Sequence, residues 1–243
     1  MNPSCKNTTG NLILLNLDLK ITNNNILFSH KHPYPPFLFQ NTEKLIVGTL
    51  PPPRFYKGKL KIGDVDFCYG SIDGLLWKIL DEIFTLNLEF KTTELAIEQR
   101  KNFLIERKIG ICDIVDSCER QKIDASDVGM QNIVLRDLLH YLKRVPNVHT
   151  LLLTGGNSKN GPEYHLRNQL KARKIKLKIL DAGHPKIHSF EFDNRIINVI
   201  SLIAPSGSAN RAIGSNPLYK LRKQENSKYN TFDFRVEQYK KFF

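Results

Sequence analysis

The chain has little of what marks a membrane, secreted or metal-binding protein. No apolar run approaches the ~20 residues that a membrane-spanning helix needs. The first ten residues are too polar for a secretory signal. The four cysteines form no C-x-x-C pair and have no histidines at zinc-finger spacing. These absences predict a cytoplasmic protein with reduced thiols, without a membrane partner, a metal or an organic cofactor.

Acidic residues are also too few to balance the basic ones. The 36 lysines and arginines exceed the 24 aspartates and glutamates, which gives a net charge of +12. Such a surplus favours a polyanionic partner, and without a membrane-binding segment the predicted partner is DNA. The alternative is a codon bias toward Lys, Asn and Ile, which raises the charge without a function.

Short apolar runs alternate with segments of helical periodicity. Strands are predicted at 15–21, 26–28, 44–48, 111–115, 148–153, 175–180 and 199–203, and helices at 76–83, 94–110, 133–143 and 163–171. This alternation predicts an α/β three-layer sandwich with a mostly parallel central sheet. Ligands bind beyond the carboxyl ends of such strands, which points to the loops after Gly48, Val115, Thr154 and Ala204.

The same pattern predicts one monomeric domain over 1–243. Residues 1–43 form an N-terminal extension packed on it, and residues 212–243 form a basic C-terminal segment. The lysine-rich stretch 171–178 alternates basic and apolar residues, which is typical of an edge strand protected from aggregation.

Three motifs fall on the predicted ligand-binding loops. The first is Gly48-Thr49-Leu50-Pro51, the second runs from Tyr69-Gly70-Ser71 to Trp77, and the third is Ala204-Pro205-Ser206-Gly207-Ser208-Ala209-Asn210-Arg211. Their order resembles the uracil-DNA glycosylase superfamily, nearest to the mismatch-specific uracil/thymine and hypoxanthine-DNA glycosylase branches. The stretch from Asp113 to Arg120, followed by Asp124 to Asp127, also resembles the hypoxanthine branch.

The resemblance implies an enzyme that flips a base out of DNA and binds it in a pocket. It places Tyr69 against the flipped base, where stacking contributes ~1–3 kcal/mol; a structural tyrosine is the alternative. Further residues implied in base binding are Gly48, Thr49, Leu50 and Pro51. Residues expected to contact the DNA backbone are Ser206, Gly207, Ser208, Asn210, Arg211, Lys57 and Lys59.

Two departures from the family pattern concern catalysis. The family places a catalytic Asn at one of two positions, which are occupied here by Leu50 and Gly74. Nearby carboxylates are chemically adequate substitutes, because a carboxylate orients water and stabilises a sugar cation. The carboxylates considered are Asp73, Asp64 and Asp66. The alternatives are a helix N-cap for Asp73 and solvated loop charges for the other two.

A third departure is Ser208, which stands where the mismatch-specific branch has an apolar wedge. His184, after a predicted strand, is either a pocket residue or a turn histidine. The sequence therefore predicts a DNA glycosylase that hydrolyses the N-glycosidic bond of uracil or hypoxanthine. The alternatives are a damaged-DNA-binding protein that does not cleave and an α/β enzyme acting on nucleotides through Gly155-Gly156-Asn157.

Overall fold

A six-stranded sheet forms the centre of the computed structural model, which describes residues 19–22 and 25–243. Its strands are ordered β4-β3-β7-β10-β9-β8. They span Ile109–Ile111, Lys44–Val47, Thr150–Leu153, Arg195–Ser201, Lys186–Phe192 and Lys178–Asp181 in that order. The first four strands run parallel to one another, β9 runs antiparallel to them, and β8, antiparallel to β9, runs in their direction again, which confirms the mostly parallel sheet.

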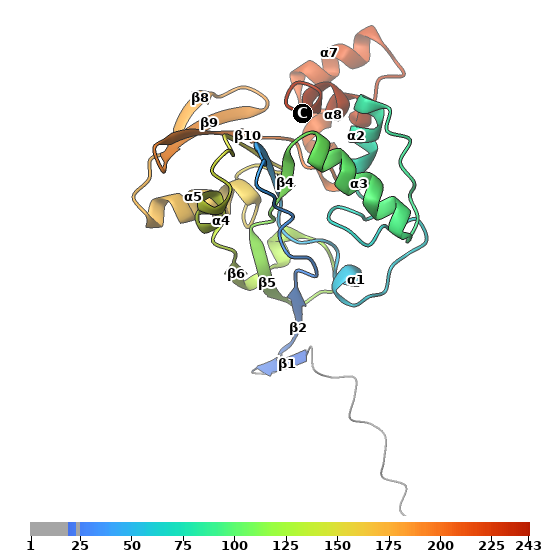
Figure 1. Cartoon of the computed structure of the whole chain (residues 1–243). Helices are drawn as coiled ribbons and strands as arrows, with labels where there is room; N and C mark the ends of the chain where they lie inside the picture. The colour runs from blue at the N-terminus through green and yellow to red at the C-terminus, as the bar shows by residue number, and fades with distance from the viewer. Residues whose placement is uncertain (1–18, 23–24) are drawn as a thin grey trace, which may run out of the picture.

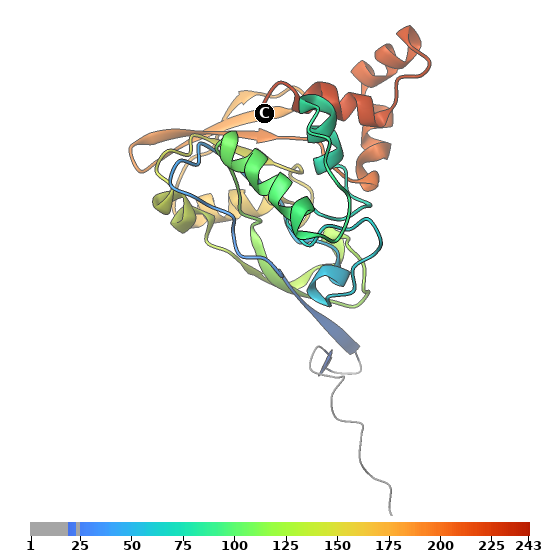
Figure 2. The ribbon, with the colours of Figure 1, turned by 45° about the vertical axis from the view of Figure 1, so that its right-hand side comes forward.

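Helices cover both faces of this sheet (Figure 1, Figure 2). On one face lie α4 (Leu138–Arg144) and α5 (Pro162–Ala172), and on the other lie α2 (Leu76–Phe84), α3 (Glu94–Glu106) and α8 (Thr231–Tyr239). The three-layer α/β sandwich is thus confirmed. Three shorter helices are α1 (Pro53–Tyr56), α6 (Asn210–Ser215) and α7 (Pro217–Glu225).

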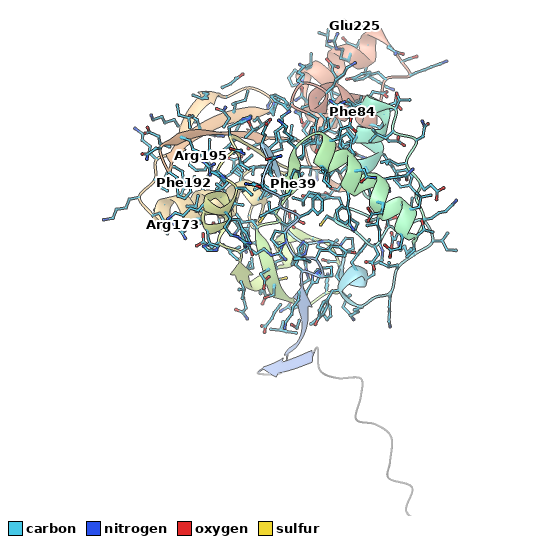
Figure 3. The ribbon with its side chains drawn as sticks, in the orientation of Figure 1. Phe39, Phe84, Arg173, Phe192, Arg195 and Glu225 are labelled. Atoms are coloured by element: carbon cyan, nitrogen blue, oxygen red, sulfur yellow. The ribbon has the colours of Figure 1, made fainter. Side chains whose placement is uncertain are left out.

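β3 and β7 are apolar after their first residues, as befits strands whose two faces are both buried. In β3, Leu45 and Val47 pack into one hydrophobic core, whereas Ile46 packs into the other. Leu151 and Leu152 of β7 divide in the same way. Continuous apolar runs are typical of such doubly covered parallel strands. Figure 3 shows side chains filling the space on both sides of the sheet.

A second, antiparallel sheet of order β1-β2-β5-β6 lies beside the first. Its strands are Leu19–Thr22, Asn25–Lys31, Val115–Arg120 and Gln131–Leu135. The β1–β2 hairpin projects from the body (Figure 1). The first part of the predicted strand at 15–21, up to residue 18, lies outside the described residues, and so do residues 23 and 24, which precede the predicted strand at 26–28.

Two predicted elements are wrong. The helix expected over 133–143 begins later, because its first residues belong to strand β6 and only the rest forms α4. Asp137 caps α4: its carboxylate accepts a hydrogen bond from His140 N–H at 3.1 Å. Gly110, expected to end a helix, lies inside β4, where Phe37 and Leu38 pack closely against it.

The C-terminal part forms α6, α7 and α8, which gather at one corner of the molecule near α2 (Figure 1, Figure 2). Two 3-10 turns complete the fold, Asp127–Gly129 and Gly207–Ala209. β8 is the outer strand of the large sheet, but the lysine-rich stretch 171–178 predicted as an edge strand lies mostly before it, in the end of α5 and the loop that follows, and only Lys178 belongs to β8. Among the described residues, no helix combines the length and apolarity needed to cross a membrane.

Candidate functional site

A cavity of about 640 Å³ opens at the carboxyl ends of β3, β7 and β10. Its walls come from the segments 49–52, 69–76, 125–128 and 204–208, together with Asp113, Thr154 and Ser158. The size is within the range of about 300–1,000 Å³ that small-ligand pockets span. The cavity therefore lies where the sequence predicts a ligand site, and all three motifs contribute to it.

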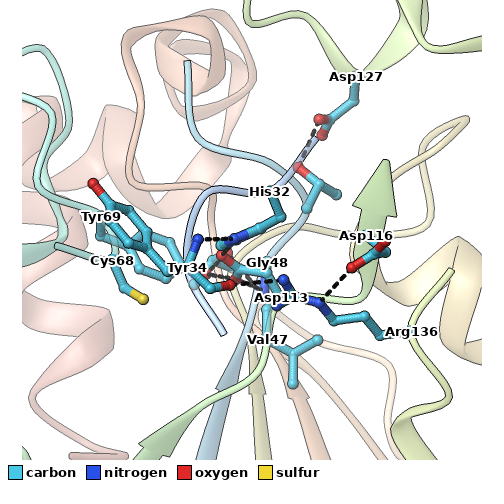
Figure 4. A network of polar contacts seen from close by, with 12 residues as sticks. His32, Tyr34, Val47, Gly48, Cys68, Tyr69, Asp113, Asp116, Asp127 and Arg136 are labelled. Atoms are coloured by element: carbon cyan, nitrogen blue, oxygen red, sulfur yellow. Dashed lines mark hydrogen bonds and ion pairs between the residues drawn. The ribbon is translucent and has the colours of Figure 1, made fainter. Parts of the chain in front are cut away.

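Asp113 forms the floor of this cavity and is 5% exposed. It follows β4 in a stretch that stays beside β3, since Ile114 N–H donates to the Gly48 carbonyl at 2.9 Å. Its Oδ1 accepts hydrogen bonds from Gly48 N–H at 2.8 Å and from the Tyr69 hydroxyl at 2.8 Å (Figure 4). The first and second motifs are thus joined through one buried carboxylate.

The other oxygen of Asp113 contacts His32. His32 Nε2 lies 2.9 Å from Asp113 Oδ2, and the Tyr34 backbone N–H donates to His32 Nδ1 at 3.1 Å. Because Nδ1 accepts this hydrogen bond, the ring proton resides on Nε2 and is donated to Asp113. The carboxylate on the cavity floor therefore has donors on both oxygens.

Tyr69 stands over this floor with its ring along the cavity wall. Its hydroxyl lies 3.1 Å from Thr154 Oγ1 as well as bonding to Asp113. Burial, and then the negative charge of Asp113, raise the pKa of the phenol well above its usual range. Gly48 makes this arrangement possible, because a Cβ there would lie 2.8 Å from Asp113 Oδ1 and closer still to the Tyr69 hydroxyl.

Asp127 is a second carboxylate in the cavity wall, carried by the loop between β5 and β6. Its Oδ1 accepts a hydrogen bond from the Thr49 hydroxyl at 2.7 Å. Burial raises the pKa of this carboxyl above its usual range, and the Thr49 hydrogen bond only partly opposes the shift. A half-buried carboxyl with a raised pKa is a candidate for proton transfer.

Asp73 also lines the cavity, but at its rim, where its side chain is 61% exposed. The carboxylate pairs with Lys61 at 3.0 Å and with Arg54 at 3.2 Å. The N-cap alternative is wrong, because α2 has Leu75 as its N-cap residue and no side chain caps it.

The other two expected catalytic aspartates are not among the residues that line the cavity. Asp64 is fully buried and forms a two-bond pair with Arg54, at 2.7 and 2.8 Å. Burial alone would raise its pKa, but hydrogen bonds from Arg54 and from two backbone N–H groups outweigh it and lower the pKa to about 2. Asp66 is exposed and accepts the Tyr34 hydroxyl at 2.6 Å.

The third motif forms part of the cavity mouth. Ser206, Gly207 and Ser208 line it, and the hydroxyls of the two serines lie 2.7 Å apart. Arg235 of α8, fully buried, holds this loop by donating to the carbonyls of Ala204 and Ser206 at 3.0 and 2.7 Å. The C-terminal helix thus positions a site loop, a role that the sequence does not reveal.

The remaining predicted residues lie on the surface outside the cavity lining. They are Asn210 and Arg211 at the start of α6, Lys57 and Lys59 after α1, and His184 between β8 and β9. Lys57 Nζ lies 4.3 Å from the centre of the Phe28 ring. The structure thus brings Thr49, Leu50, Pro51, Tyr69, Asp73 and Ser206–Ser208 together around one cavity.

Asp113 and Asp127 were missed as site residues by the sequence analysis. Both lie in the stretch that resembles the hypoxanthine branch, and that resemblance is the signal that could have found them. Asp113 falls in the middle of the predicted strand 111–115, whereas β4 ends at Ile111 and leaves Asp113 beyond its carboxyl end. In the part of the chain that the structure describes, no three His, Cys, Asp or Glu side chains gather as a metal site would require.

Comparisons with known proteins give a structural match. No family model matches the chain, and no curated protein does. The fold is similar to a solution NMR structure described as a "putative Uracil DNA glycosylase" from Methanosarcina acetivorans, with a TM-score of 0.49 and 16% sequence identity. The match covers 86% of this chain and 99% of that one. This similarity concerns the fold, and the chemistry of the cavity follows from the residues that line it.

Proposed function

We propose that this protein is a DNA glycosylase that removes a deaminated base, uracil or hypoxanthine, after flipping it into the cavity. The observation that supports this most is the composition of the cavity: an aromatic wall, a hydrogen-bonding floor and a half-buried carboxylate meet in one space. A flipped base needs a surface to stack on and polar groups to read its edge.

The floor supplies the recognition in this proposal. Tyr69 offers its ring for stacking, while its hydroxyl, Asp113 and Thr154 form the polar end of the cavity. Leu50 and Leu75 add apolar surface to the walls. Such a mixture of apolar walls with a few fixed polar groups suits a planar heterocycle.

Asp127 carries the chemistry in this proposal. Its carboxylate takes a proton from a water molecule whose oxygen attacks the sugar carbon C1′, and the bond from C1′ to the base breaks with its electron pair on the base. Asp127 then returns the proton to the departing base. Its raised pKa favours this exchange, because a general base works best when its pKa approaches the working pH.

Asp73 remains the second catalytic candidate, from the rim. Its carboxylate already pairs with Arg54 and Lys61, so its negative charge is largely compensated and less of it is left to stabilise a sugar cation. Asp64 is a weaker candidate than either, since four hydrogen bonds occupy its carboxylate. Asp66 lies on the exposed surface beside Tyr34.

The DNA backbone is proposed to lie across the mouth of the cavity. Ser206 and Ser208 offer hydroxyl groups, and the exposed Lys57, Lys59 and Arg211 offer charge. Lys59→Ala and Arg211→Ala should each weaken binding to all duplexes and reduce the slope of log K against log salt by about one. Fluorescence anisotropy at several salt concentrations measures this slope, and binding without salt dependence would contradict the proposed surface.

The decisive experiment is a panel of oligonucleotides that contain uracil or hypoxanthine, assayed for abasic sites by strand cleavage in alkali. The parent protein should release at least one of these bases. Asp66→Asn is a matched control, because it changes an exposed carboxylate outside the cavity lining. Release of none of the bases, despite salt-dependent binding, would favour the second candidate function.

That second candidate is recognition of damaged DNA without cleavage. The observation that favours it is the absence of an amide at both family positions, where Leu50 and Gly74 stand. In this case the cavity would bind a flipped base and hold it. Tight binding to lesion duplexes without base release distinguishes the two functions.

A further inference from the structure

Ile62 is a fully exposed aliphatic side chain at the edge of the cavity region. Its relative exposure is 102%, the highest of the exposed large hydrophobic residues that the structure describes. A single exposed isoleucine costs little, but it normally retains some contact with its neighbours. Here the side chain projects from a loop tip between Lys61 and Gly63.

The loop tip is a tight turn rather than a loose segment. Asp64 N–H donates to the Lys61 carbonyl at 3.0 Å, so Ile62 and Gly63 are the two central residues of a four-residue turn. Gly63 has a φ of +88°, which fits the third residue of a type II turn and requires glycine there. Ile62 therefore occupies the second, outward position.

Asp64 fixes this turn to the body of the protein. Its buried carboxylate accepts Lys61 N–H and Ile72 N–H, each at 2.8 Å, and pairs with Arg54. Hydrogen bonds from a cation and from two backbone groups hold the base of the turn in one conformation. The exposed side chain is thus presented on a rigid support.

The turn borders the cavity mouth and is strongly basic. Lys61 pairs with Asp73, which lines the cavity, and a Cβ on Gly63 would lie 3.0 Å from the Ile72 side chain. Lys57, Lys59 and Lys61 alternate with other residues before Ile62, and no acidic residue intervenes. An apolar tip among lysines matches a duplex, which has stacked bases between two charged backbones.

We propose that Ile62 is an apolar wedge that inserts into the base stack of duplex DNA and fills the gap left by the flipped nucleotide. The proposal rests on the proposed function. Ser208, at the family's wedge position, has a short polar side chain that is hydrogen-bonded to Ser206. Ile62 supplies the missing apolar volume from the loop between the first and second motifs, with the lysines on the flanking phosphates.

The test compares Ile62→Ser with the parent on duplex and single-stranded substrates that carry the same lesion. A single strand has no stack to be filled, so the variant should lose about tenfold in kcat/KM on the duplex and less than about twofold on the single strand. Ile179→Ser is the matched control, because Ile179 is 66% exposed on the edge strand β8. It should match the parent on both substrates.

An unchanged rate on the duplex, or an equal loss on both substrates, would overturn the wedge while leaving the glycosylase proposal intact. A parent that releases no base would overturn the glycosylase proposal instead. Insertion of the wedge can then be measured without catalysis, by the fluorescence of 2-aminopurine placed beside a tetrahydrofuran abasic site in a duplex. Binding of the parent should change its fluorescence and binding of Ile62→Ser should not; equal changes would overturn the wedge.

Discussion

Two loops near the same cavity each carry an aspartate that is at least half-buried, and the pKa values of the two carboxyls are shifted in opposite directions although burial raises both. Asp64, in the segment after α1, has a pKa lowered to about 2. Asp127, in the loop between β5 and β6, has a raised pKa. The difference lies in the donors: Asp64 has Arg54 and two backbone N–H groups, whereas Asp127 has one hydroxyl, that of Thr49.

The comparison teaches that burial alone does not identify a reactive carboxylate. A carboxylate surrounded by donors is held ionised and is structural, because its lone pairs are already used. A carboxylate that is buried with few donors keeps a proton more readily and can exchange it.

Asp64→Asn should have the largest effect, and it should be on stability. The substitution leaves the Arg54 guanidinium without its buried partner, and breaking a buried pair costs about 3–5 kcal/mol. The free energy of unfolding in urea measures this loss. Asp66→Asn, on the exposed surface, should cost less than about 1 kcal/mol. Equal losses of unfolding free energy in the two variants would contradict a structural role for the Asp64–Arg54 pair.

Asp127→Asn should instead lower the rate of base release. Losing a general base reduces catalysis by roughly a hundredfold or more, while lesion affinity stays close to that of the parent. Single-turnover rates with uracil- or hypoxanthine-containing oligonucleotides measure the change. Asp73→Asn serves as the comparison variant, and a larger loss there would transfer the catalytic role to the rim.

Tyr69→Phe tests the donors to a third aspartate, Asp113. It removes one of the donors to Asp113 and keeps the ring, so stability should fall by about 1.5 kcal/mol while the preference for lesion duplexes remains. Tyr69→Ala should lose that preference as well, because stacking contributes about 1–3 kcal/mol. Thermal unfolding and binding titrations report the two effects. Equal preference for lesion DNA in the parent and in Tyr69→Ala would make Tyr69 structural.

The smallest expected effect is the pH dependence of stability in Asp127→Asn. A carboxyl whose folded pKa is raised stabilises the fold while it is protonated, and that contribution is lost as pH rises through the folded pKa. The variant should therefore have a higher Tm than the parent at pH 7. The gain should vanish below about pH 3, where the carboxyl is protonated in both the folded and the unfolded state. A gain that is the same at both pH values would contradict the raised pKa.

The parts of the fold that the sequence predicts are those with a local pattern. Runs such as Leu45–Val47 and Leu151–Leu153 are apolar on both faces, and this placed two central strands correctly. Residues 133–135 have helical spacing in the sequence but belong to strand β6, because they pair with β5, the strand that precedes it. No local spacing carries that information.

The candidate site was predictable to a similar extent. The strand-end rule located the loops, and Tyr69, Asp73 and Ser206 do line the cavity. The environment of each carboxylate was not predictable, since Asp64 and Asp73 look alike in sequence. One is fully buried and the other is an exposed rim residue, because only Asp64 meets Arg54 together with the folded-back backbone of Lys61 and Ile72.

Gly48 has a consequence for how this cavity can diverge. A methyl group there would meet Asp113 Oδ1 at 2.8 Å and Thr154 Oγ1 at 2.9 Å, and it would displace the Tyr69 hydroxyl. Because any side chain larger than the hydrogen of glycine would clash here, a substitution at position 48 cannot change the depth of the cavity in small steps. A lineage that came to accept a larger or smaller ligand would have to remodel the walls, at Leu50 or Leu75, and keep the floor that Gly48 permits.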